Sequence, residues 1–411
     1  MIEKFFDGVV DQTYYQTGNT ERNIVLASYN NDFSVTYLKE ERYSGSGSNV
    51  FFKCIELQYD VVVEAYAPFL DTICDMFKEL GRGKFEDFLD ECGIYSFHKE
   101  ILSSYFHTGL CTRNEPMLPN EVMYEKKRMT EGIANLLIKL GEIRPIFLVI
   151  NRFNLVSQSS IDVVLYLLEH PSSNIGIVLG SNDSPWIKGE ALEHWNTMLE
   201  VLGNYNQIYH LGSTGKERLS RSVKLKNRMD KLPKTFATLK NCYYLLEFEY
   251  IEYHFNNLER QAMEEEIAIE PRWLAKLCQL YAKVSIMTQN FSKAIETLSR
   301  LKKLDSGSNN TELSFECALL TANCYMYLGR LDIAEKYAAL LEEIAQSSGE
   351  EKKIFQAKLL KVQIQMSGWH NIFFCISDIK IEDDLIEMLK STNIRIILLT
   401  YIFMPMTIIR R

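Results

Sequence analysis

Short apolar runs alternate with amphipathic stretches over the first half of the chain. Each run is rich in Val, Ile, Leu and Phe, which is typical of strands buried on both faces of a parallel sheet. The runs lie at 23–28, 49–56, 145–150, 174–180 and 206–211. Apolar residues at helical spacing lie between them, most clearly over 121–140 and 159–169. This alternation predicts an α/β fold, a doubly wound parallel five-stranded sheet.

The second half of the chain shows helical periodicity only. From Trp273 onward two predicted helical hairpins share one pattern, in which Ala294 and Ala334 take the same place. Small residues at such positions let paired helices approach closely, and the period of about 40 residues is that of a helical repeat. A third unit is predicted to begin near Glu351, since Gly368 repeats the place of Gly329. We therefore expect an all-α solenoid of helical hairpins.

These patterns divide the chain into four parts. We predict a helical lead-in at 1–22, the sheet domain at 23–215, a charged helical connector at 216–270 and the repeats at 271–411. The connector carries an aromatic stretch, which favours a role in core packing over a binding platform. The apolar final segment lacks the polar cap that a solenoid needs, so we expect the chain to be a piece of a longer protein. The aromatic residues are Tyr243, Tyr244, Phe248, Tyr250, Tyr253 and Phe255.

Composition excludes several classes of function. The formal net charge is −9, without the basic footprint that phosphate binding needs, so no direct nucleic-acid partner is expected. The nine cysteines include no CxxC pair, and the seven histidines form no HExxH motif, so we predict no metal site. Scattered thiols are typical of a reducing cytoplasm. With neither a signal peptide nor an apolar run of 18 residues, we expect no membrane association and a cytoplasmic location.

The stretch Pro145–Leu168 is central to the functional question. It combines an apolar strand, a polar turn that begins at Asn151, and an amphipathic helix. In open α/β sheets ligands bind beyond the carboxyl ends of the strands. Asn151 and Arg152 stand at that position, so their chemistry bears directly on what the sheet can bind.

Three local matches give the chain a resemblance to the STAND class of AAA-type signalling ATPases. Cys54–Glu56 followed by Ala65–Leu70 is similar to the second strand and the "PYAPF" helix start of that class. Ser159–Leu168 is similar to the "PSSLELLLYLL" helix after the Walker B strand, and Ile175–Ser181 to the next strand. The resemblance implies a P-loop NTPase-like sheet followed by tetratricopeptide-like (TPR-like) repeats.

The nucleotide site of that class is degenerate here. The segment Ser28–Thr36 holds no glycine, although a P-loop needs glycines to wrap its backbone around phosphates. Val35 replaces the lysine, and Asp32 adds a negative charge. Asn151 and Arg152 replace the two acidic residues that organise magnesium and activate water. We therefore predict no catalytic residues. A vestigial site for ATP or ADP would consist of Ser34, Thr36 and Asn151.

The sequence favours a non-hydrolysing regulatory scaffold in signal transduction that binds a protein partner through its TPR-like repeats. One alternative is a residual switch that binds ATP or ADP without hydrolysing it. Another is the N-terminal fragment of a larger signalling protein. The resemblance implies that such a protein continues into an output domain, such as a diguanylate or adenylate cyclase, a helix-turn-helix regulator or a kinase.

Overall fold

The computed structural model describes two compact units, Met1–Ile269 and Glu270–Arg411. The predicted lead-in and connector therefore belong to the same unit as the sheet. The described residues are 2–17, 23–29, 35, 38, 50–58, 62–113, 119–182, 190–211, 231–264, 268–305 and 311–368.

The first unit is built on a parallel five-stranded sheet, as the apolar runs predict. Its strands are β1 (Asn23–Tyr29), β2 (Phe51–Glu56), β3 (Ile146–Asn151), β4 (Ile175–Asn182) and β5 (Ile208–Leu211). They lie in the order β2-β3-β4-β1-β5, and every neighbouring pair is parallel, which is a P-loop-like arrangement. All six residues of β3 are buried, because this strand has neighbours on both sides and helices over it.

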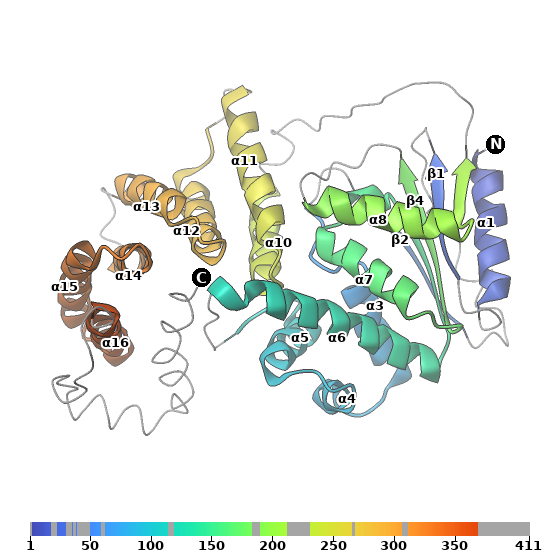
Figure 1. The fold of residues 1–411 in the computed structure, drawn as a ribbon, viewed down its shortest axis with the longest axis horizontal. Coiled ribbons are helices and arrows are strands. Elements are labelled where there is room, and N and C mark those ends of the chain that lie inside the picture. The colour runs from blue at the N-terminus through green and yellow to red at the C-terminus, as the bar shows by residue number, and fades with distance from the viewer. Residues whose placement is uncertain are drawn as a thin grey trace. The chain divides into compact units, whose positions relative to one another are not determined.

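Four helices follow one another over one side of the sheet, where Figure 1 shows α6, α7 and α8 side by side. They are α3 (Phe69–Leu80), α6 (Val122–Ile143), α7 (Gln158–Glu169) and α8 (Glu190–Asn204). The helix α6 contacts both α3 and α7, and α7 contacts α8. Two further helices, α4 (Phe85–Glu91) and α5 (Ser96–Thr108), link α3 to α6. Because β2, β3 and β4 are adjacent, the α6 and α7 crossovers lie on one face when both are right-handed.

The first helix, α1 (Ile2–Gln16), packs on the sheet rather than preceding it as a separate segment. Its residues Phe6, Val9 and Val10 share one core cluster with residues from β1, β2, β3 and β4. Val35 and Leu38, from the connection between β1 and β2, lie in the same cluster. They are the only described residues of the stretch 30–49.

The connector helices α10 (Leu232–Tyr244) and α11 (Phe248–Glu264) complete the first unit. In the aromatic stretch Phe248, Tyr250 and Phe255 are buried, and the other three rings are half-buried. The predicted packing role is confirmed, because buried aromatic rings supply large apolar contact areas. Residues 216–230 lie outside the described part.

The second unit is a series of helices, α12 (Pro271–Met287), α13 (Phe291–Asp305), α14 (Thr311–Tyr327), α15 (Leu331–Ser348) and α16 (Glu351–Gly368). Consecutive helices pack on one another, with α12 against α13 and α14 against α15. Ala294 and Ala334 are fully buried, as their matching positions predict. Gly329 has a φ of +70°, which lets the chain reverse between α14 and α15. The helix α16, expected as the first of a third hairpin, begins at Glu351 as predicted. Its predicted partner helix falls in residues 369–411, which lie outside the described part of the chain.

Candidate functional site

The candidate site is the carboxyl edge of the sheet, where β1, β2 and β3 end in Tyr29, Glu56 and Asn151. Side chains alternate between the two faces of a strand, and these three lie on the same face as the core residues two positions before them. Those residues, Ala27, Cys54 and Val149, belong to or pack against the cluster that α1 covers. The sheet therefore brings a phenol, a carboxylate and an amide to one edge.

A hydrogen bond between Tyr29 and Asn151 spans this edge. The Tyr29 hydroxyl donates to Asn151 Oδ1 at 2.5 Å, although β4 lies between their strands. The bond is possible because β4 has a glycine there: a Cβ on Gly180 would lie 2.7 Å from Asn151 Oδ1 and 3.3 Å from the Tyr29 ring. Both side chains are buried, Tyr29 with 1% and Asn151 with 0% of its surface exposed. The ring of Tyr29 thus fills the space above the edge.

Arg152 and Glu56 form an ion pair at the part of the edge where β2 and β3 end. Arg152 Nη1 lies 3.1 Å from Glu56 Oε1 and donates to the Leu57 carbonyl at 3.0 Å. The second oxygen of Glu56 accepts the backbone N–H of Val35 at 3.0 Å. The turn is tight, since Arg152 has a φ of +60° and its own N–H donates to the Tyr29 hydroxyl. The Glu56 carboxylate therefore accepts the Val35 N–H, which belongs to the segment that would wrap phosphate in a P-loop.

The residues predicted for a vestigial nucleotide site are only partly described. Asn151 lies at the carboxyl edge as predicted, but its amide oxygen already accepts a bond within the protein. Ser34 and Thr36 lie outside the described residues, and so does Asp32. Val35, predicted at the lysine position of a P-loop, is fully buried in the core under α1. A lysine at this position would have to bury its ammonium group, which is costly without a charged partner.

A second polar arrangement at the start of α7 was not predicted. Glu247, in the turn between α10 and α11, has 1% of its surface exposed and accepts the Ser159 N–H at 2.6 Å. Lys126 Nζ, on α6, lies 3.7 Å from its other oxygen. The first N–H groups of a helix lack partners within the helix, and the helix dipole favours an anion beside them. The N-cap residue Ser157 makes no side-chain cap bond. The carboxylate of Glu247 is the anion at this helix start instead.

No local pattern in the sequence marks the role of Glu247. It is 88 positions from Ser159 in the chain, and a lone glutamate in a charged connector is indistinguishable from a solvated one. Its apolar neighbours Leu245 and Leu246, both buried, were the available hint that the turn faces inward.

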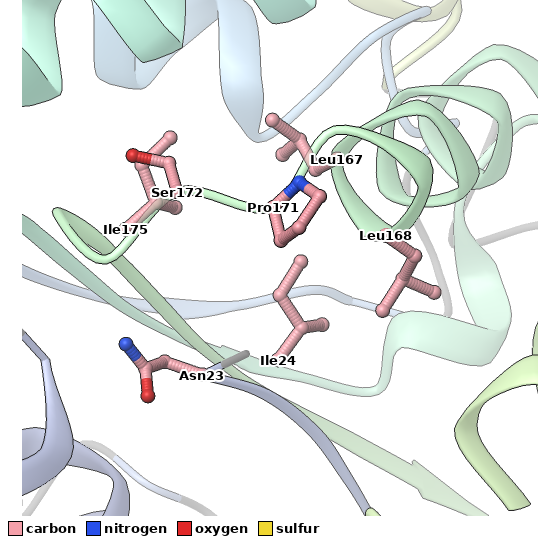
Figure 2. A pocket seen from close by; sticks show the side chains of 7 residues that line it. All are labelled: Asn23, Ile24, Leu167, Leu168, Pro171, Ser172 and Ile175. Atoms are coloured by element: carbon pink, nitrogen blue, oxygen red, sulfur yellow. The ribbon is translucent and has the colours of Figure 1, made fainter. Parts of the chain in front are cut away.

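A small cavity opens at the opposite, amino-terminal end of the sheet (Figure 2). It is lined by Asn23, Ile24, Leu167, Leu168, Pro171, Ser172 and Ile175. Its volume is about 10 Å³, whereas a single water molecule needs about 10–15 Å³. This cavity is too small for a nucleotide or another organic ligand.

Two further kinds of site are absent from the described part of the chain. No group of three or more His, Cys, Asp or Glu side chains there has a geometry that could hold a metal ion. Among the same residues, no helix combines the length and the apolar composition needed to cross a bilayer.

Comparison with known proteins gives no family assignment, because no family model matches the chain and no curated protein matches it significantly.

Replacing Tyr29 by Phe tests the closure of the edge. The variant keeps the ring but leaves Asn151 Oδ1 without the phenol donor, so we expect the free energy of unfolding to fall by about 1–2 kcal/mol. Urea denaturation followed by circular dichroism measures the change. Tyr15→Phe is the matched control, since Tyr15 is 75% exposed on α1 and its hydroxyl is not part of the edge. If both substitutions changed the free energy of unfolding equally and negligibly, the Tyr29–Asn151 hydrogen bond would not stabilise the edge.

Proposed function

We propose that the protein is a non-hydrolysing regulatory scaffold with a degenerate STAND-like ATPase unit, which binds a protein partner through its TPR-like helices in the cytoplasm. The observation that carries the proposal is the Tyr29–Asn151 bond across the carboxyl edge of the sheet. Phosphoryl transfer depends on positioned cations and backbone donors at that edge. Here those positions hold a buried phenol, an amide and an arginine–carboxylate pair that bond to one another.

The helical unit supports the binding part of the proposal, because ion pairs fix the spacing of its alternate helices. Glu316 on α14 pairs with Lys283 and bonds to Gln279, both on α12. Lys353 on α16 lies 2.5 Å from Glu312 on α14, with only 7% of its side chain exposed. A helical array with fixed spacing offers a preformed surface, which lowers the entropic cost of binding an extended partner.

Two measurements on the full chain test the proposal. In a calorimetric titration with ATP or ADP plus magnesium we expect no binding, or a Kd no tighter than about 1 mM, which corresponds to about −4 kcal/mol. Micromolar binding would replace the proposal by the residual-switch alternative.

With a co-purified partner, we expect lysine cross-links at Lys276, Lys283, Lys358 and Lys361 of the helical unit. Cross-links confined to Lys99, Lys127 and Lys139 of the first unit would contradict partner binding through the repeats.

The double variant Asn151→Asp, Arg152→Asp is expected to show no ATP hydrolysis. It restores two carboxylates at the end of β3, yet Val35 stays buried and Tyr29 still fills the edge. Phosphate release in the presence of magnesium measures the activity. Hydrolysis above the level of the unmodified chain would mean that the phosphate-binding segment lies elsewhere.

A further inference from the structure

Two carboxylates share one phenol on the side of the first unit where the connector docks. Tyr105 Oη, on α5, lies 2.7 Å from Glu64 Oε2 and 2.6 Å from Asp71 Oδ1. The tyrosine is buried, and both carboxylates are half-buried. These are normal hydrogen-bond distances for both oxygen pairs.

The number of available hydrogens decides the charge of this cluster. A phenol has one O–H and can donate to one carboxylate only, and an ionised carboxylate only accepts. Both short contacts are satisfied together when one carboxyl holds a proton, so that it donates to Tyr105 while Tyr105 donates to the other. With both carboxyls ionised, one contact loses its hydrogen and two like charges face each other across one oxygen.

The proton belongs on Glu64. Asp71 lies in the first turn of α3, where the helix dipole stabilises a negative charge. Glu64 has no helix terminus of its own, and burial, followed by the charge of Asp71, raises its pKa above the usual range, against the lowering effects of its Asn241 and Tyr105 bonds. The pKa of Tyr105 is raised far above its ordinary value by burial and by the two carboxylates, so the phenol keeps its hydrogen.

Glu64 also connects this cluster to α10. Asn241 Nδ2 donates to Glu64 Oε1 and, at 3.0 Å, to the Gly109 carbonyl, while Asn241 Oδ1 accepts the Cys111 N–H at 2.8 Å. Asn241 is almost fully buried, with 2% exposed. The titratable and charged groups that act on Glu64 from the surrounding elements are Asp71 on α3, Tyr105 on α5, Cys111 after α5, and Lys234 and Cys242 on α10.

We propose that Glu64, Tyr105 and Asp71 form a proton-operated latch, which holds α10 against the α3–α5 helices while one proton is shared in the cluster and loosens it when that proton is lost. The folded chain retains a proton that the unfolded chain loses near pH 4.3, the ordinary value for glutamate. The latch therefore contributes fully below that pH, and its contribution is lost as the pH rises through the raised pKa of Glu64.

Hydrogen exchange of the full chain tests the latch. The readout is the protection factor of the Cys111 amide, whose acceptor is Asn241, and of the α10 amides, between pH 5 and 8.5. Protection is expected to fall by up to about tenfold per pH unit once Glu64 ionises, which is the limit for the loss of one proton. In Glu64→Gln, which imitates the protonated side chain, we expect high protection that does not vary with pH.

A second variant and a control separate the latch from general stability. Asp71→Asn removes the facing charge, so the pH at which protection falls is expected to drop by about 1 unit. Glu91→Gln, an exposed glutamate on α4, should leave the profile unchanged. Constant protection in the unmodified chain across this pH range would overturn the proposal, and so would the same fall in Glu64→Gln or an unmoved midpoint in Asp71→Asn.

Discussion

Replacing Gly176 by Ala is expected to destabilise the first unit by about 3 kcal/mol or more, because overpacking at a rigid contact forces the backbone to shift. Gly176 lies on β4 beneath the end of α1. A Cβ there would collide with the Thr17 hydroxyl and lie 2.7 Å from the Phe147 ring. Neither can retreat easily, since Thr17 Oγ1 bonds to the Thr13 carbonyl and Phe147 is fully buried.

Chemical denaturation of the full chain, with tryptophan fluorescence and circular dichroism as probes, measures this effect. Gly8→Ala is the matched control. Gly8 lies in the middle of α1 with no atom within 4 Å of an added Cβ, so the same substitution should stabilise the helix by about 0.5–1 kcal/mol. If Gly176→Ala were as harmless as Gly8→Ala, then α1 would not pack closely on β4.

Replacing Glu247 by Ala is also expected to lower the stability of the first unit strongly. In Glu247→Ala the Ser159 N–H and the Lys126 ammonium lose a buried partner, and we expect a loss of about 2–4 kcal/mol. For a unit of this size such a loss lowers the melting temperature by roughly 5–12 °C. Scanning calorimetry measures it, and the loss should be accompanied by faster hydrogen exchange at the start of α7.

Two further variants sharpen the interpretation of Glu247. Glu247→Gln keeps an oxygen for the Ser159 N–H and loses the charge, so its effect should be smaller than that of Ala. Glu264→Ala removes a glutamate that is 66% exposed and 3.8 Å from Arg260, and it should change stability by less than about 0.5 kcal/mol. Equal effects at positions 247 and 264 would contradict a role of Glu247 in capping α7.

The architecture was largely predictable from the sequence. All five predicted strands are present within two residues of their expected ends. The central strand β3 is buried throughout, which is typical of a short, continuous apolar run, whereas the edge strands β2 and β5 are only partly buried. The repeat pattern placed Ala294 and Ala334 at buried helix contacts for a similar reason, since only a small side chain permits close approach. Hydrophobic periodicity is a local property of the chain, and both the strands and the helical repeats were predicted from it.

The arrangement at the carboxyl edge of the sheet was predictable only in part. The sequence identified Asn151 as the end of a strand without a catalytic carboxylate, and it identified the glycine-free segment after β1. It did not identify Tyr29 as the partner of Asn151, because that bond depends on the strand order and on Gly180 between them. The same holds for α1, whose amphipathic pattern does not specify which surface it covers.

The sequence by itself determined the class of fold and the division into a sheet and a helical array. Hydrophobic periodicity and side-chain chemistry are written along the chain and need no partner to be recognised. The tertiary structure alone decided which polar side chains meet. Tyr29 and Asn151, Glu247 and Ser159, and Glu64 and Tyr105 meet only because the sheet order and helix packing bring distant segments within hydrogen-bond distance.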